Sequence, residues 1–92
     1  MQPIVADLPD RLLERAKRTK HGWKRRDLDA LYTGFGFEIE DREKHRYYVH
    51  PLYPFLIGSA PKGRDITAGF VADAVRIVGK LIALKDQKGG QS

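Results

Sequence analysis

Two of the three histidines in this chain stand at the two ends of one short aromatic segment. Residues 45–50 read His-Arg-Tyr-Tyr-Val-His, and Pro51 follows them. Histidine can take up or release a proton near neutral pH, so it is a frequent acid–base catalyst. The aromatic and β-branched residues between the histidines favour a β-strand. We therefore expect a central strand here, and His45 is the first candidate for proton-transfer chemistry.

Successive side chains of a strand point to opposite faces of its sheet. The pattern predicts that residues 45, 47 and 49 face the core and that residues 46, 48 and 50 point away from it. His45 and His50 then lie on opposite faces, so one metal ion cannot bind both. The sequence offers no third ligand at a recognisable spacing, no cysteine and no nucleotide-binding glycine loop. We predict no metal site and no cofactor.

Positive charge is concentrated near the N-terminus. The 92 residues include 17 Lys and Arg against 12 Asp and Glu, for a net charge of +5. The cations between positions 11 and 26 are opposed there only by Glu14, and they are Arg11, Arg15, Lys17, Arg18, Lys20, Lys24, Arg25 and Arg26. Such asymmetry favours a polyanion such as nucleic acid, although a solvated helix face explains it about as well. We expect Arg15, Arg18, Arg25 and Arg26 to bind RNA non-specifically.

The length suits one domain with one hydrophobic core. After a loose arm over residues 1–7, hydrophobic periodicity predicts helices at about residues 9–19, 24–33 and 67–84, of which the last is the strongest. Strands are expected at about residues 35–43, 45–51 and 55–57. Trp23 should anchor the corner between the first two helices. Short connections favour an antiparallel meander with the helices on one face, an α+β fold.

No part of the sequence indicates a membrane protein. No apolar run approaches the roughly 20 residues of a membrane span, and the N-terminus lacks the charged-then-apolar order of a secretory signal. The absence of cysteine fits a reducing compartment. We expect a soluble, cytoplasmic protein.

From about Asp27 to Val78 the sequence resembles the HicA family of bacterial toxins. Residues 27–37 look like the family's first helix running into its Gly-Phe strand start. Residues 45–51 match the family's histidine, the aromatic strand after it, and the His-Pro pair that stands five and six positions after that histidine. Residues 61–66, Pro-Lys-Gly-Arg-Asp-Ile, are similar to the Pro-His-Gly-Lys-Glu-Leu turn of the family. Residues 69–71, Gly-Phe-Val, are similar to its Gly-Thr-Leu helix opening.

The resemblance implies a double-stranded-RNA-binding-domain-like α-β-β-β-α fold, here preceded by an extra N-terminal helix. It implies a metal-independent endoribonuclease that cleaves messenger RNA, the mRNA interferase of a type II toxin–antitoxin system, held inactive by a HicB-like antitoxin. His45 would be the catalytic residue, and positive charge for phosphate would come from Lys44, Arg46, Lys62 and Arg64. The chain would divide into an arm and basic helix (1–22), the HicA-like domain (23–84) and a flexible tail (85–92).

The sequence departs from the family pattern in three places. Glu43-Lys44 replace the Gly-Ser that usually precedes the histidine, Lys62 replaces a second histidine, and the first 22 residues or so exceed the family core. Two other interpretations stay open: a nonenzymatic RNA-binding module of the same fold, and a protein-interaction domain with a basic docking helix. His50 is expected to be a packing residue at the strand end, and His21 a loop residue.

Overall fold

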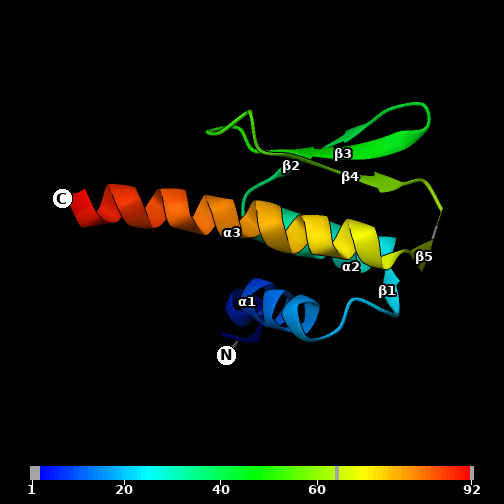
Figure 1. The fold of residues 1–92 in the computed structure, drawn as a ribbon, viewed down its shortest axis with the longest axis horizontal. Helices are drawn as coiled ribbons and strands as arrows, with labels where there is room; N and C mark the ends of the chain where they lie inside the picture. The colour runs from blue at the N-terminus through cyan, green and yellow to red at the C-terminus, as the bar shows by residue number, and fades with distance from the viewer. Residues whose placement is uncertain (1–2, 64, 92) are drawn as a thin grey trace.

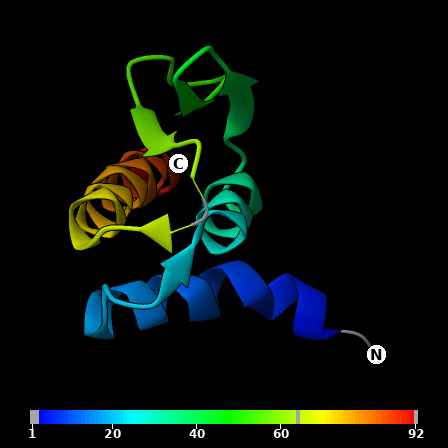
Figure 2. The same ribbon diagram turned by 90° about the vertical axis from the view of Figure 1, so that its right-hand side faces the viewer.

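The computed structural model describes residues 3–63 and 65–91, which form three layers (Figures 1 and 2). The elements, in chain order, are α1 (Pro3–Arg18), β1 (Trp23–Lys24), α2 (Arg25–Gly34), β2 (Glu38–Asp41), β3 (His45–Val49), β4 (Ile57–Pro61), β5 (Asp65–Ile66) and α3 (Ala68–Gln91). Strands β2, β3 and β4 form an antiparallel meander with β3 in the centre. Helices α2 and α3 cover one face of this sheet, and α1 crosses beneath them on the side away from it. The other two strands, β1 and β5, form a separate antiparallel pair.

The structure confirms the predicted α+β architecture, in which three antiparallel strands have helices on one face (Figure 2). The order of the meander and the central position of the strand that begins at His45 are also as predicted. Trp23 is buried at the corner between α1 and α2, where its indole N–H donates to the Thr19 carbonyl at 3.1 Å. Within the described residues, no helix has the length and apolar character needed to cross a membrane.

The predicted faces of the central strand were wrong. Tyr48 and His50 are buried against the helices, whereas His45 is exposed and Tyr47 and Val49 are partly exposed on the uncovered face of the sheet, called here the open face. Tyr48 and His50 each have a hydrogen-bond partner inside the fold. The Tyr48 hydroxyl donates to Asp29, and His50 Nδ1 accepts the backbone N–H of Leu52 at 3.1 Å. Because these groups are hydrogen-bonded, burying them costs less than their polarity suggests.

An aromatic stack joins the sheet to the helices. The ring of Tyr32 from α2 stacks on the ring of Tyr48 at a centroid distance of 4.2 Å. The ring of Phe37 packs edge-on against Tyr32, with a centroid distance of 5.1 Å. Helix α3 completes this core with side chains that are fully buried, namely Val71, Ala74, Val78 and Leu81. Phe70 and Val75, also predicted in this core, are half-buried at its margin. Among the expected core residues near β2, Phe37 is buried, but Ile39 on the edge strand is 38% exposed.

Several boundaries differ from those that the sequence predicts. Helix α1 begins at Pro3, within the expected arm, and α3 continues to Gln91, through the expected tail. Leu13 and Ala16 of α1 are buried in the common core. The division of the chain at residues 22 and 84 stays a prediction.

The third strand also lies later than predicted, at Ile57–Pro61 rather than at 55–57. Its Gly-Ser-Ala centre lacks the bulky residues that mark most strands, because Tyr32 lies directly beneath Gly58. A Cβ at Gly58 would lie 2.5 Å from Tyr32 Cζ and closer still to the hydroxyl. The Tyr32 ring is held between Tyr48 and Phe37, so it cannot move aside.

Gly58→Ala should therefore destabilise the protein by about 1–3 kcal/mol, the usual cost of overpacking a core. Thermal or urea unfolding measures this change. Gly79→Ala is the matched control, because Gly79 is exposed on α3 and a Cβ there would meet no atom within 4 Å. Its expected effect is a stabilisation of about 0.5–1 kcal/mol from helix propensity. Equal midpoints for Gly58→Ala and the wild type would refute the close packing.

Candidate functional site

His45 is exposed at the first position of β3, on the open face of the sheet. It stands opposite Pro61 of β4, and its carbonyl accepts the backbone N–H of Arg42 at 2.9 Å. Its ring centroid lies 6.3 Å from that of Tyr47, which occupies the same face two residues on. The imidazole is therefore accessible to a large ligand that approaches from the side without helices.

Arg42 places a cation on the same face. Its guanidinium carbon lies 5.0 Å from the centroid of the Tyr47 ring, and Nη2 lies 2.8 Å from a carboxylate oxygen of Glu40. The hydrogen bond to Glu40 raises the pKa of Arg42, so the guanidinium keeps its charge. Sequence reasoning missed this residue. Once residues 43 and 44 are taken as the hairpin turn, the register places position 42 directly opposite His45, and this signal was available in the sequence.

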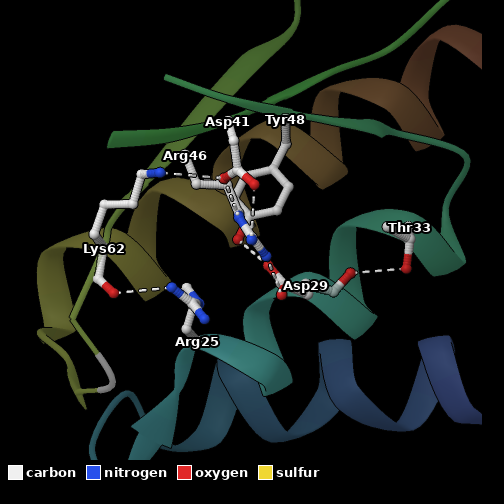
Figure 3. Close-up of polar contacts among 7 residues, drawn as sticks. All are labelled: Arg25, Asp29, Thr33, Asp41, Arg46, Tyr48 and Lys62. Carbon is white, nitrogen blue, oxygen red and sulfur yellow. Dashed lines mark hydrogen bonds and ion pairs between the residues drawn. The ribbon is translucent and has the colours of Figure 1, made fainter. Parts of the chain in front are cut away.

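Arg46, expected beside His45, points to the opposite face of the sheet. Its guanidinium lies between two carboxylates (Figure 3), with Nη1 2.6 Å from Asp29 and Nε and Nη2 at 2.8 and 3.1 Å from the two oxygens of Asp41. Only 17% of the side chain is exposed. The hydrogen bond between Arg46 and Asp41 raises the pKa of Arg46 and lowers that of Asp41. A phosphate could contact Arg46 only by displacing a carboxylate.

Tyr48 extends this group of contacts into the core. Its hydroxyl donates to the second oxygen of Asp29, whose first oxygen accepts from Arg46. Burial, followed by the bond to Asp29, raises the pKa of Tyr48, so the phenol is a neutral donor. Asp29, Asp41, Arg46 and Tyr48, called here the polar clamp, connect α2 to the β2–β3 hairpin on the helix-facing side.

Lys62 also lies on the helix-facing side. Its Nζ is 3.8 Å from Asp41, and its carbonyl accepts from Arg25 Nη1 at 2.8 Å (Figure 3). Nearby, an open hollow of about 510 Å³ at the start of α2 is lined by Lys24, Arg25, Arg26, Asp29 and Asp65. Lys24 pairs with Asp65 across it at 3.0 Å.

The remaining predicted RNA-binding residues differ in how firmly the fold holds them. Arg15 is engaged: its guanidinium lies 4.6 Å over the Trp23 ring and 3.8 Å from Asp27. Arg18, Arg26 and Lys44 are exposed. For these three, no ion pair is found within the described part of the chain. Arg64 lies outside the described residues.

The other two histidines have the local roles expected of them, packing for His50 and a loop position for His21, although His50 lies on the face opposite to the one predicted. His50 is buried at the end of β3, with its ring edge-on to Phe37 at 5.1 Å. A Cβ at Gly36, where φ is +94°, would lie 3.2 Å from His50 Nε2, so a glycine suits that turn. His21 is exposed in the loop before β1. Across residues 3–63 and 65–91, no three His, Asp or Glu side chains are grouped so as to hold a metal ion.

One end of the molecule gathers most of these groups. The β2–β3 hairpin, the end of β4 and the β1–β5 pair lie together at the end opposite the C-terminus (Figure 1). The hairpin carries Arg42, Lys44 and His45, and the start of α2 carries Arg25 and Arg26. The structure thus brings His45 to the same end as Arg25 and Arg26 at the start of α2, but separates it from Arg46 and Lys62 by the thickness of the sheet. The basic residues of α1 lie in the layer farthest from the sheet.

No protein-family model matches the chain, and comparisons with curated proteins and with solved structures find no significant similarity. A functional assignment therefore depends on the geometry of these residues and on the short motifs described above.

The Asp41 carboxylate should make stability depend on pH. Its hydrogen bond from Arg46 lowers its pKa in the folded protein, below the value of about 3.9 expected in the unfolded chain. The contribution to stability is therefore complete above the unfolded-state pKa and is lost as the pH falls through the folded-state pKa.

Asp41→Asn should consequently lower the urea midpoint at about pH 7 and have a smaller effect at about pH 3, below the unfolded-state pKa, where part of this contribution to stability is already lost. Glu43→Gln, in the exposed turn of the same hairpin, is the control and should change neither midpoint appreciably. A loss from Asp41→Asn of the same size at both pH values would contradict the ion pair.

Proposed function

We propose that this chain is a HicA-like toxin, a metal-independent endoribonuclease that cleaves messenger RNA and is neutralised by an antitoxin. The observation that carries the proposal is the position of His45, exposed on the open face at the basic end of the molecule. The order of α2, the three-stranded meander and α3 is compatible with the double-stranded-RNA-binding-domain-like fold that the resemblance implies. Helix α1 would be the extra N-terminal helix.

The chemistry needs few groups. In RNA cleavage the 2′-oxygen forms a bond to phosphorus as it loses its proton, and the bond from phosphorus to the 5′-oxygen breaks as that oxygen gains one. An acid–base side chain and a nearby cation lower the barrier. We assign the role of acid–base side chain to His45 and the stabilisation of the phosphate charge to Arg42. Tyr47, partly exposed beside both, offers a ring on which a base can stack.

Substrate binding would depend on exposed cations, of which Arg26 and Lys44 lie at the same end and Arg18 lies at the end of α1, in the layer farthest from the sheet. Arg18, Arg26 and Lys44 have no ion pairs within the described residues, so they can contact phosphates without breaking one. Arg15 and Arg25 already hold α1 and α2 in place through Trp23 and the Lys62 carbonyl. Their contribution to binding would be smaller than their charge suggests.

His45→Ala should reduce RNA cleavage by about 10²- to 10⁴-fold, the usual contribution of one acid–base residue. The circular dichroism spectrum and the unfolding midpoint should stay close to those of the wild type, because His45 is exposed. His21→Ala, which removes another exposed histidine, is the matched control and should retain full activity. Cleavage should persist in a chelator and fail on RNA whose 2′-hydroxyl groups are replaced by hydrogen. A folded His45→Ala protein that cleaves at the wild-type rate would refute the assignment.

The salt dependence of RNA binding should separate the free cations from the engaged ones. Arg18→Gln and Arg26→Gln should each flatten the plot of log affinity against log salt by roughly 0.7–0.9, the loss of one phosphate contact. Arg15→Gln should mainly lower the unfolding midpoint, because it loses the contact with Trp23. If all three variants leave the slope unchanged, the basic segment serves solvation or a protein partner.

The second candidate function is a nonenzymatic RNA-binding module. Its specific support is that Arg46 and Lys62, expected to stabilise the phosphate beside His45, contact Asp41 on the other side of the sheet. Salt-dependent RNA binding without cleavage by the wild-type protein would establish this alternative. Binding to an acidic protein but not to RNA would favour a protein-interaction domain.

A further inference from the structure

The two edges of the sheet differ in their charge. Strand β2, at one edge, reads Glu-Ile-Glu-Asp, and every residue in it is exposed. Strand β4, at the other edge, reads Ile-Gly-Ser-Ala-Pro and carries no charge. Charged side chains on an edge strand discourage pairing with another chain, so β2 is protected and β4 is not.

The hydrogen-bond pattern identifies the backbone groups that β4 directs outward. Bonding alternates along an antiparallel strand. Arg42 donates to His45 on the β2 side, and His50 donates to Leu56 on the β4 side. Even-numbered residues of β3 therefore bond to β4, where their partners are Gly58 and Ala60. The N–H and C=O groups of the alternate residues, Ile57 and Ser59, point to the free edge.

Alternate residues of β4 face opposite sides of the sheet. Gly58 and Ala60 are buried on the helix-facing side, whereas Ile57 is 51% exposed and Ser59 is partly exposed on the open face. Among the described residues, no loop or other element makes a backbone hydrogen bond to Ile57 or Ser59. Figure 2 shows β4 above α3, with no further strand on the side away from β3.

Apolar side chains adjoin this edge. Leu52 is 74% exposed and Phe55 is 70% exposed, both in the loop that leads into β4. Together with Ile57 they place three large exposed apolar side chains within six residues, from 52 to 57. Clustered exposure of this kind is typical of a contact surface for another protein.

We propose that the free edge of β4 binds an extended segment of an acidic protein partner, which adds a fourth strand to the sheet. Backbone bonds to Ile57 and Ser59 would supply the pairing, and apolar side chains of the segment would cover Ile57 and Phe55. This inference rests on the sheet alone and does not depend on RNA cleavage.

The net charge of the chain and the position of Pro61 indicate which kind of molecule binds the β4 edge. A second copy of this chain would bring together two molecules with a net charge of +5 each. In antiparallel self-pairing centred on Ser59, the Ile57 carbonyl would face Pro61, which has no N–H to donate. An acidic partner avoids both costs. RNA cannot supply the alternating N–H and C=O groups of a strand.

The test uses a soluble probe, a capped seven-residue peptide that alternates valine with glutamate or threonine. In NMR titrations of the full chain, the amides of Ile57 and Ser59 should shift and exchange more slowly with solvent. The same peptide with alternate backbone nitrogens methylated cannot form the ladder and should not produce these changes. The His45→Ala protein should bind like the wild type, which keeps this result separate from that of the cleavage assay.

Ser59→Pro removes one outward N–H and should weaken peptide binding at least about tenfold, while the β3 pairing is kept. Ile39→Pro is the matched control on the β2 edge, where residue 39 also directs its N–H outward, and it should leave affinity unchanged. If Ser59→Pro fails to fold, Ser59→Glu keeps the N–H and should weaken binding by charge repulsion.

Three results would overturn the proposal. The first is no change at Ile57 and Ser59 up to about 1 mM peptide, where even a weak complex should form. The second is equal binding by the methylated peptide, which would indicate simple attraction to the basic surface. The third is a dimer of the chain alone that Ser59→Pro abolishes, which would assign the edge to a second copy.

Discussion

The candidate site depends on the ion pairs that Arg46 makes with Asp29 and Asp41. Asp29 belongs to α2 and Asp41 to β2, so one guanidinium fastens the β2–β3 hairpin to the helix layer. Two-point contact with the Asp41 carboxylate fixes direction as well as distance, which a lysine could not do. The hairpin end that carries His45 and Arg42 is thereby held in one position relative to the basic start of α2.

The two faces of the sheet differ in how much of them is covered. On the helix-facing side, the stack of Tyr32 and Tyr48 and the close approach of Tyr32 to Gly58 leave no room for a ligand. The polar clamp lies at the margin of that side, beside the hollow at the start of α2. The open face has no such cover, so His45, Arg42 and Tyr47 are accessible from that side. Packing on one face of the sheet stabilises the structure, and the side chains to which we assign chemistry lie on the other face.

Sequence reasoning predicted the elements better than it predicted their faces. Aromatic and β-branched composition placed the central strand, and periodicity placed α2 and α3, because their apolar residues recur at helical spacing. It assigned Arg46 and Tyr48 to the solvent side because their partner, Asp29, lies 17 and 19 positions away and no local pattern reveals that contact. The predicted position of strand β4 was wrong because its residues are small, and they are small because Tyr32 packs directly against Gly58. Strand propensity alone does not reveal this contact. The catalytic role proposed for His45 comes from a family resemblance, and the structure adds that this side chain is exposed on the open face of the sheet.

Which face of the sheet would contact RNA is the central question for the proposed function, and an NMR titration addresses it directly. A short RNA with every 2′-hydroxyl methylated binds without being cleaved, so the complex lasts through the measurement. We expect the side-chain signals of His45, Tyr47 and Arg42 to change together with those of exposed cations such as Arg26. Changes confined to the hollow lined by Lys24, Arg25 and Asp65, with the open face unaffected, would contradict the proposal.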